Sequence, residues 1–215
     1  MKIQNSIIGL ITFIMLLNAP NLQCEENNDK KDNFYIGVKG GFNVSNVYDT
    51  EGENFTADPK LGLAVGGFMS IPLGEFIGVQ PELIYSQRGY NRVGKVLGIN
   101  YDLTHSKNYL DIPILFAIKP SELFTILAGP QYSYLVSQSN TFTSGGNVVT
   151  NQEDYENDNV RKNTLCITGG FDVHFDQILA SARVGWDLLN NNGDGTDTDP
   201  RYKNSWYQIS VGFRF

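Results

Sequence analysis

Apolar and polar residues alternate along eight stretches of the chain. This period-two pattern is typical of β-strands that turn one face toward an apolar environment. In the last stretch, the odd-numbered residues from Tyr207 to Phe215 are apolar or aromatic, whereas the even-numbered residues between them are polar or glycine. The eight stretches cover residues 34–44, 61–71, 77–88, 110–119, 123–136, 165–175, 180–187 and 208–215. The pattern predicts an all-β fold.

The connections between these stretches are alternately long and short. The long ones are 46–59, 89–108, 137–163 and 189–204, and the short ones are 72–76, 120–122 and 176–177. This rhythm predicts an eight-stranded antiparallel up-and-down transmembrane β-barrel with short periplasmic turns and long external loops. A soluble lipocalin-like barrel is the alternative. Water would then touch its outer face, so it has less reason to keep that face apolar on every strand.

The amino-terminal residues predict export from the cytoplasm. An apolar run at 7–17 follows Lys2; it is too short to span a bilayer and fits the hydrophobic region of a secretory signal. We therefore expect a signal peptide at 1–24, a short periplasmic segment at 25–33 and the barrel domain at 34–215.

Cys24 raises the alternative of a lipoprotein, in which this thiol is acylated after cleavage. However, Asn21 and Gln23 stand where a lipoprotein signal has an apolar and a small residue. Once the signal is removed, only Cys166 is sure to remain, so we expect no intrachain disulfide and no cysteine-based metal site.

Composition narrows the class of protein further. The chain has 23 acidic and 16 basic residues, a net charge of −7, and 41% hydrophobic residues. No second apolar segment is long enough for a spanning helix. A barrel remains compatible, because only alternate residues of each strand face lipid. The acidic balance argues against a nucleic-acid partner, and we expect outer-membrane lipid to surround the protein.

The predicted lumen carries charges of both signs. Eight strands enclose a space that side chains can fill, so we expect a packed interior rather than an open pore. Buried charges must pair, because an isolated one is too costly. We expect a salt-bridge network formed by Glu82, Asp172, Arg183 and Arg214. The alternative is that the same residues line a narrow ion path. The lumen-facing charged positions are Lys39, Glu82, Arg88, Asp111, Lys119, Asp172, Arg183, Asp187 and Arg214.

Three further patterns contain residue types that can bind ligands or catalyse reactions. The first begins like the oxygen ligands of a calcium loop, with Asn190, Asn192 and Asp194. Arg201 stands where the closing glutamate would be, so we expect a solvated external loop without a metal or cofactor.

The second is an aromatic set, which is expected to lie mostly at the membrane interface. Its members are Phe34, Tyr85, Tyr132, Tyr134, Trp186, Trp206 and Tyr207.

The third pattern is a possible acyl-transfer triad on neighbouring strands. It combines His174, Ser181 and Asp172, like those of outer-membrane lipid-modifying enzymes. Neither histidine of the chain sits in a recognisable nucleophile motif. We therefore expect that the protein is not an enzyme.

Several segments, in order, resemble the PorT family of outer-membrane β-barrels. They are 35–43, 78–89, 109–115, 128–132 and 209–215. The resemblance implies a bacterium of the Bacteroidota type, an outer-membrane location and an eight-stranded barrel. The founding member is tied to protein export by the type IX secretion system, but no segment here singles out that component. The terminal strand also resembles those that the barrel-assembly machinery recognises, with Phe213 and Phe215 as the signal.

These observations predict a non-enzymatic integral outer-membrane barrel with a structural or interaction role in the cell envelope. One alternative is a component of a type IX secretion or envelope complex. The other is a narrow channel or small-ligand-binding barrel.

Overall fold

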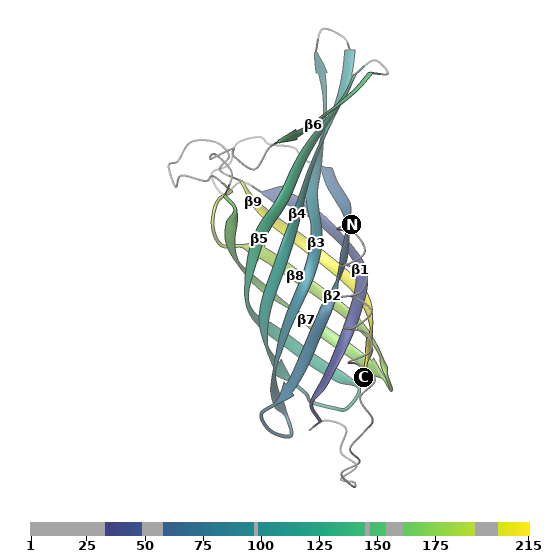
Figure 1. Ribbon diagram of the computed structural model, residues 1–215, viewed down its shortest axis with the longest axis vertical. Coiled ribbons are helices and arrows are strands. Elements are labelled where there is room, and N and C mark those ends of the chain that lie inside the picture. The colour runs from purple at the N-terminus through teal and green to yellow at the C-terminus, as the bar shows by residue number, and fades with distance from the viewer. Residues whose placement is uncertain (1–32, 49–57, 97–98, 145–146, 154–160, 192–201) are drawn as a thin grey trace, which may run out of the picture.

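A computed structural model describes residues 33–48, 58–96, 99–144, 147–153, 161–191 and 202–215, and these form an all-β structure (Figure 1). Its strands are β1 (Tyr35–Tyr48), β2 (Asp58–Pro72), β3 (Ile77–Val96), β4 (Ile99–Ile118), β5 (Phe124–Ser144), β6 (Asn147–Glu153), β7 (Asn163–Phe175), β8 (Ile178–Asp187) and β9 (Lys203–Arg214). Within the described residues, no helix is long and apolar enough to cross a bilayer. The expected signal peptide and Cys24 lie outside these residues.

Eight of the strands close into an antiparallel barrel. Each pairs with the next along the chain, β5 pairs with both β4 and β7, and β1 pairs with β9 to close the wall. The closing register runs from Gly37 opposite Arg214 to Tyr48 opposite Lys203. β6 pairs with β5 alone and stands outside the closed ring. The predicted eight-stranded fold is confirmed.

Two of the predicted long connections are largely strand. Residues 89–108 continue β3 to Val96 and begin β4 at Ile99, and part of 137–163 forms the end of β5 and all of β6. The outer parts of these strands rise above the ring (Figure 1), where side chains need not be apolar because they do not face lipid. The period-two apolar signal therefore ends before the strand pairing does.

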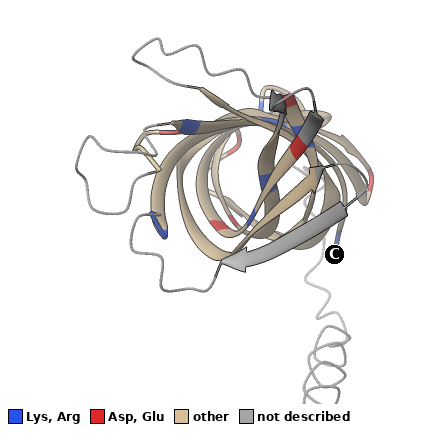
Figure 2. Cartoon of the chain, turned by 90° about the horizontal axis from the view of Figure 1, so that it is seen from above, with Lys and Arg blue, Asp and Glu red and all other residues tan. Residues whose placement is uncertain are grey.

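The two faces of the wall have opposite chemistry. Large apolar side chains on the outer face are exposed on every strand of the ring; examples are Val38, Phe42, Phe116, Ile167 and Ile209. Most charged side chains of the ring point inward and are buried. From above, charged positions of both signs are seen on strands around the ring (Figure 2). An apolar exterior around a polar interior is the arrangement expected of a barrel in lipid.

Apolar side chains fill the interior near the short turns. Tyr35, Phe68 and Leu179 pack together there, and the Tyr35 and Phe68 rings meet edge to face with centroids 6.1 Å apart. Gly37 leaves room for the Phe68 ring, because a Cβ at this position would overlap it. Leu115 belongs to a second group of buried apolar residues, farther along the wall. This end of the lumen is therefore packed.

Candidate functional site

The charged interior of the barrel is the candidate site, and its first part lies next to the apolar packing. The periplasmic cluster consists of Lys39 on β1, Glu82 on β3, Asp172 on β7 and Arg183 on β8, all buried. Lys39 Nζ lies 2.6 Å from Glu82 Oε2, Arg183 Nη2 lies 3.5 Å from Glu82 Oε1, and Arg183 Nη1 lies 2.7 Å from Asp172 Oδ1. Two cations and two anions thus tie together four strands.

Neutral side chains complete the hydrogen bonding of both carboxylates in this cluster. The Gln80 amide donates to Glu82 Oε1 at 2.9 Å and to Asp172 Oδ2 at 3.2 Å. The Ser181 hydroxyl donates to Asp172 Oδ1 at 2.6 Å. Every carboxylate oxygen of the cluster therefore has a donor, which is the condition under which buried ion pairs are tolerated.

The structure brings together three of the four residues expected in the network, and Lys39 joins them. Arg214, the fourth, lies apart from them at the end of β9, where it is partly exposed. Its Nε donates to the Asp176 carbonyl oxygen at 2.5 Å, and its guanidinium lies 5.2 Å from the centroid of the Tyr35 ring. Arg214 thus lies at the periplasmic rim of the barrel, outside the cluster.

The second part, the outer cluster, consists of Arg88 on β3, Lys107 and Asp111 on β4, and Asp187 on β8, all buried. Arg88 and Asp111 form an ion pair, and the Ser133 hydroxyl donates to Asp111 Oδ1 at 2.6 Å. The Arg88 guanidinium lies 3.6 Å from the centroid of the Trp206 ring, on β9. This aromatic face adds a cation–π contact to the ion pair.

Asp187 is held by neutral donors. The Cys166 thiol donates to its Oδ1 at 3.1 Å, the Asn204 backbone N–H donates to its Oδ2 at 3.1 Å, and the Asn204 side-chain amide donates to the same oxygen. Cys166 is thereby a buried hydrogen-bond donor inside the barrel, and it forms no disulfide with a described residue.

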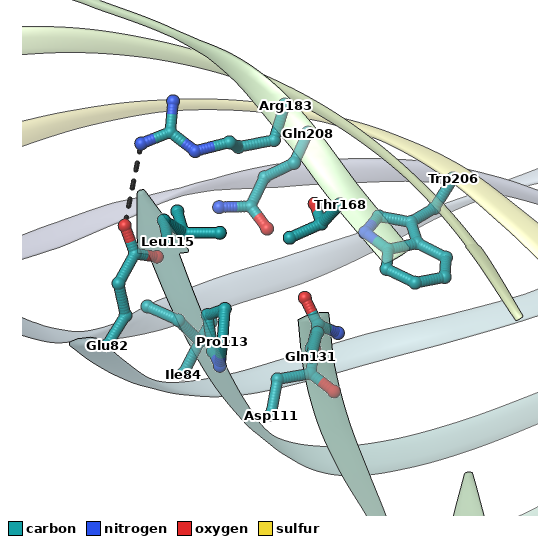
Figure 3. Close-up of a pocket in the computed structure, with 10 residues that line it drawn as sticks. All are labelled: Glu82, Ile84, Asp111, Pro113, Leu115, Gln131, Thr168, Arg183, Trp206 and Gln208. Atoms are coloured by element: carbon teal, nitrogen blue, oxygen red, sulfur yellow. Dashed lines mark hydrogen bonds and ion pairs between the residues drawn. The ribbon is translucent and has the colours of Figure 1, made fainter. Parts of the chain in front are cut away.

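The space between the two clusters is small. Figure 3 shows Arg183, Glu82 and Leu115 on one side of it and Trp206 on the other, with Gln208 and Thr168 between them. The cavity measures about 10 Å³, which is about the least volume that holds one water molecule. At this level the lumen is filled by side chains.

Trp206 departs from the aromatic set, most of which is expected at the membrane interface. Its side chain is 2% exposed and lies inside the barrel, whereas Trp186 and Tyr207 face outward. Gly185 of the neighbouring strand makes this possible, because a Cβ there would overlap the indole. Even-numbered residues of this alternating strand face the lumen. The position of Trp206 in the sequence therefore already predicts that its side chain points inward.

Lys107 is the interior cation that sequence reasoning missed. It lies on β4 in the segment expected to be a connection, so its side chain was not assigned to the lumen. It is 2% exposed.

The triad residues do not form a nucleophile–base pair. Ser181 donates to Asp172, as above, whereas His174 Nε2 lies 3.0 Å from Thr125 Oγ1 near the periplasmic end. No hydrogen bond joins Ser181 to His174, both of which belong to the described part of the barrel. The geometry required for proton transfer from the serine is therefore missing.

Of the three candidate calcium ligands, only Asn190 belongs to the described residues. Its carbonyl oxygen accepts a hydrogen bond from Arg161 Nε at 2.8 Å. Asn192 and Asp194 lie outside them. In the described parts of the chain, no three His, Cys, Asp or Glu residues are grouped closely enough to hold a metal ion.

The terminal aromatics lie on the outer face of the wall. Phe213 pairs with Val38 of β1 and Ile178 of β8, and the Phe215 backbone N–H donates to the Ile36 carbonyl oxygen at 2.8 Å. The two rings meet with centroids 5.3 Å apart, and both are exposed. This places the expected assembly signal next to the seam between β1 and β9.

Several solved structures resemble the chain. Ail, the attachment invasion locus protein of Yersinia pestis, is 13% identical over 84% of this chain and 98% of its own, with a TM-score of 0.43. Neisserial surface protein A is 9% identical over 85% and 97%, with a TM-score of 0.45. OprG of Pseudomonas aeruginosa is 14% identical over 86% and 97%, with a TM-score of 0.39. No curated protein matches the sequence.

The family assignment rests on the sequence itself. Residues 23–192 match the outer membrane protein beta-barrel domain. The match covers all of the strands except β9, which closes the ring against β1. The chain therefore belongs to the outer membrane protein beta-barrel domain family and is an integral protein of the outer membrane of Gram-negative bacteria.

Proposed function

We propose that this protein is a non-enzymatic outer-membrane barrel, similar to the PorT family of Bacteroidota, whose role is to hold an interaction surface outside the membrane. The observation that carries the proposal is the contrast between a packed lumen and strands that continue beyond it. The periplasmic cluster and the apolar side chains beside it fill the interior. β3, β4 and β5 continue outward, where β6 joins them (Figure 1).

Among the described residues, the outer sheet formed by β3, β4, β5 and β6 has two edges without a further strand partner. Above Asn91, which pairs with Asp58 of β2, β3 has only β4 as a strand partner within the described residues. At the other edge, β6 pairs with β5 and with no other described strand. Free edges present unpaired backbone donors and acceptors, which a strand of another protein can use. A protein of the cell envelope is the partner we propose.

Shortening the outer sheet tests this role without touching the ring. Gln138 and Glu153 are register partners, so residues 139–152 can be replaced by an Asn-Gly turn that rejoins the strands. A second variant removes the other edge by shortening the β3–β4 hairpin, with an Asn-Gly turn between the partners Arg92 and Leu103. Both variants keep all eight ring strands.

The readout is crosslinking in the native envelope, followed by mild detergent extraction. We expect the parent chain to capture an envelope protein and at least one of the two variants to lose it, which identifies the edge that binds, while both variants still show a heat-modifiable band on gels. A lone monomer from the parent chain would contradict the interaction role.

Two alternatives lead to different measurements. A type IX secretion or envelope component would co-purify with other proteins of that complex. A narrow channel would conduct in planar bilayers, and a ligand-binding barrel would retain a small molecule through purification. The small cavity between the clusters favours the closed form over the channel.

Barrel-assembly machinery, acting on Phe213 and Phe215, is the partner we propose during insertion.

A further inference from the structure

Lys107 belongs to the outer cluster, but its ammonium group forms no ion pair or hydrogen bond with a described residue. It lies directly opposite Arg88 in the β3–β4 register, and both side chains are buried. Residues that face each other in this way share one face of the sheet, and like charges at such positions destabilise it. Arg88 is compensated by Asp111 and Trp206. Lys107 needs a separate explanation.

The ammonium group of Lys107 has no acceptor among the described residues. Its Nζ is buried and makes no hydrogen bond with a described residue, and it lies 5.3 Å from the centroid of the Tyr202 ring. The nearby carboxylates are bonded elsewhere: Asp111 to Arg88 and Ser133, and Asp187 to Cys166 and Asn204. A buried ammonium left in this state is costly, because it has lost its water without gaining an acceptor.

Other donors without acceptors lie beside it. Arg88 Nε and Nη1 and the Tyr109 hydroxyl are also buried and have no hydrogen-bond partner in the described chain. The Arg88 guanidinium lies 5.0 Å from the Tyr109 ring centroid, and Tyr109 follows Lys107 by two residues on the same face of β4. A register shift between β4 and β5 falls between Asn108 and Tyr109. Such irregularities often redirect side chains at functional sites.

We propose that Lys107, Arg88 and Tyr109 form a binding site for one oxyanionic group, a phosphate, sulfate or carboxylate, that enters the outer mouth of the barrel from solution. The ligand must accept hydrogen bonds and carry negative charge, because the unsatisfied groups are a cation, a guanidinium and a phenol. Such donors bind oxyanions through charge-assisted hydrogen bonds. The site is independent of the proposed role of the outer sheet, which concerns strand edges and not the lumen.

The chain provides its own probe for a binding experiment. Trp206 lies against Arg88, and Trp186, on the outer face, is the only other tryptophan. In a Trp186→Phe background, Trp206 fluorescence would be followed in nanodiscs of zwitterionic lipid. The titrants are sodium phosphate, sulfate and acetate at constant ionic strength set with sodium chloride.

We expect a saturable change with at least one of the three anions, weakened about tenfold or more in Lys107→Met, since a hydrogen bond to a charged group is lost. Lys107→Arg should retain binding. The matched control is Lys203→Met at the start of β9, because Lys203 donates to the Leu188 carbonyl oxygen at an exposed position. That variant should bind like the parent.

Three results would overturn the proposal: no saturable change with any anion, equal affinity in Lys107→Met and the parent, or a Lys107-dependent change only when the nanodiscs contain anionic lipid. A heat-modifiable band checks that each variant folds. If Lys107→Met does not fold, Tyr109→Phe takes its place. It should weaken binding severalfold, and unchanged affinity would count equally against the site.

Discussion

The periplasmic and outer clusters each contain one lysine, one arginine and two carboxylates, but the hydrogen-bonding needs of these groups are met differently. In the periplasmic cluster, Lys39 and Arg183 meet two carboxylates whose oxygens are all hydrogen-bonded. In the outer cluster, Arg88 has a carboxylate, whereas the Lys107 ammonium has no acceptor in the described structure. The first arrangement holds strands together, and the second leaves a charge available. Burial alone does not distinguish a structural ion from one that is free to bind.

The largest expected effect comes from removing an anion of the periplasmic cluster. Glu82→Gln leaves Lys39 without its carboxylate and Arg183 with Asp172 alone. Breaking a buried, hydrogen-bonded pair typically costs about 3–5 kcal/mol. We expect a loss of that order in the free energy of unfolding, measured by urea titration in lipid vesicles.

The control for this substitution is Glu122→Gln. Glu122 is exposed in the short turn between β4 and β5, so its stability should match the parent within about 0.5 kcal/mol. Equal stability of Glu82→Gln and Glu122→Gln would contradict a structural role for the cluster.

The two buried lysines provide the sharpest test of the comparison. Lys39 is 3% exposed and ion-paired, and Lys107 is 2% exposed and unpaired in the described chain. Lys39→Met should lower the free energy of unfolding by about 3 kcal/mol, because buried Glu82 loses its shorter ion pair and its Oε2 loses the donor, although Oε1 keeps Arg183. In phosphate-free, sulfate-free buffer, Lys107→Met should change it by less than about 1 kcal/mol, because no partner is stranded. Equal losses in the two variants would remove the distinction between the clusters.

A smaller effect is expected where an aromatic face compensates a cation. The Arg88 guanidinium stacks on the indole of Trp206, and the cation–π contact weakens from indole to phenyl. Trp206→Phe should therefore cost about 1 kcal/mol in the same unfolding measurement. Trp186→Phe, on the lipid-facing side, keeps the interior unchanged and serves as the control. A larger loss in the control than in Trp206→Phe would argue against the stacking contribution.

The sequence predicted which way side chains face more reliably than how far along the barrel they lie. Alternation placed Lys39, Glu82, Asp172 and Arg183 on the inner face, as found. It could not place them along the barrel axis, because that position depends on strand register. For this reason the expected network included Arg214, although the structure places this residue at the periplasmic rim.

The outer cluster was harder to predict for a different reason. Lys107 follows no apolar alternation, because its part of β4 lies beyond the regularly apolar outer face. Without that signal, the segment looked like a connection, and its inward side chains were overlooked. Pairing partners such as Arg88 and Lys107 become visible only when the register between β3 and β4 is known.

Ion pairing inside the periplasmic cluster stabilises the closed ring, and a double-mutant cycle on Lys39 and Glu82 measures this contribution. The free energies of unfolding of the parent, Lys39→Met, Glu82→Gln and the double variant would be compared in lipid vesicles. We predict a coupling energy of about 1.5 kcal/mol or more, with the double variant less destabilised than the sum of the single ones. A coupling energy within about 0.5 kcal/mol of zero would show that the two side chains act independently, and it would contradict the claim.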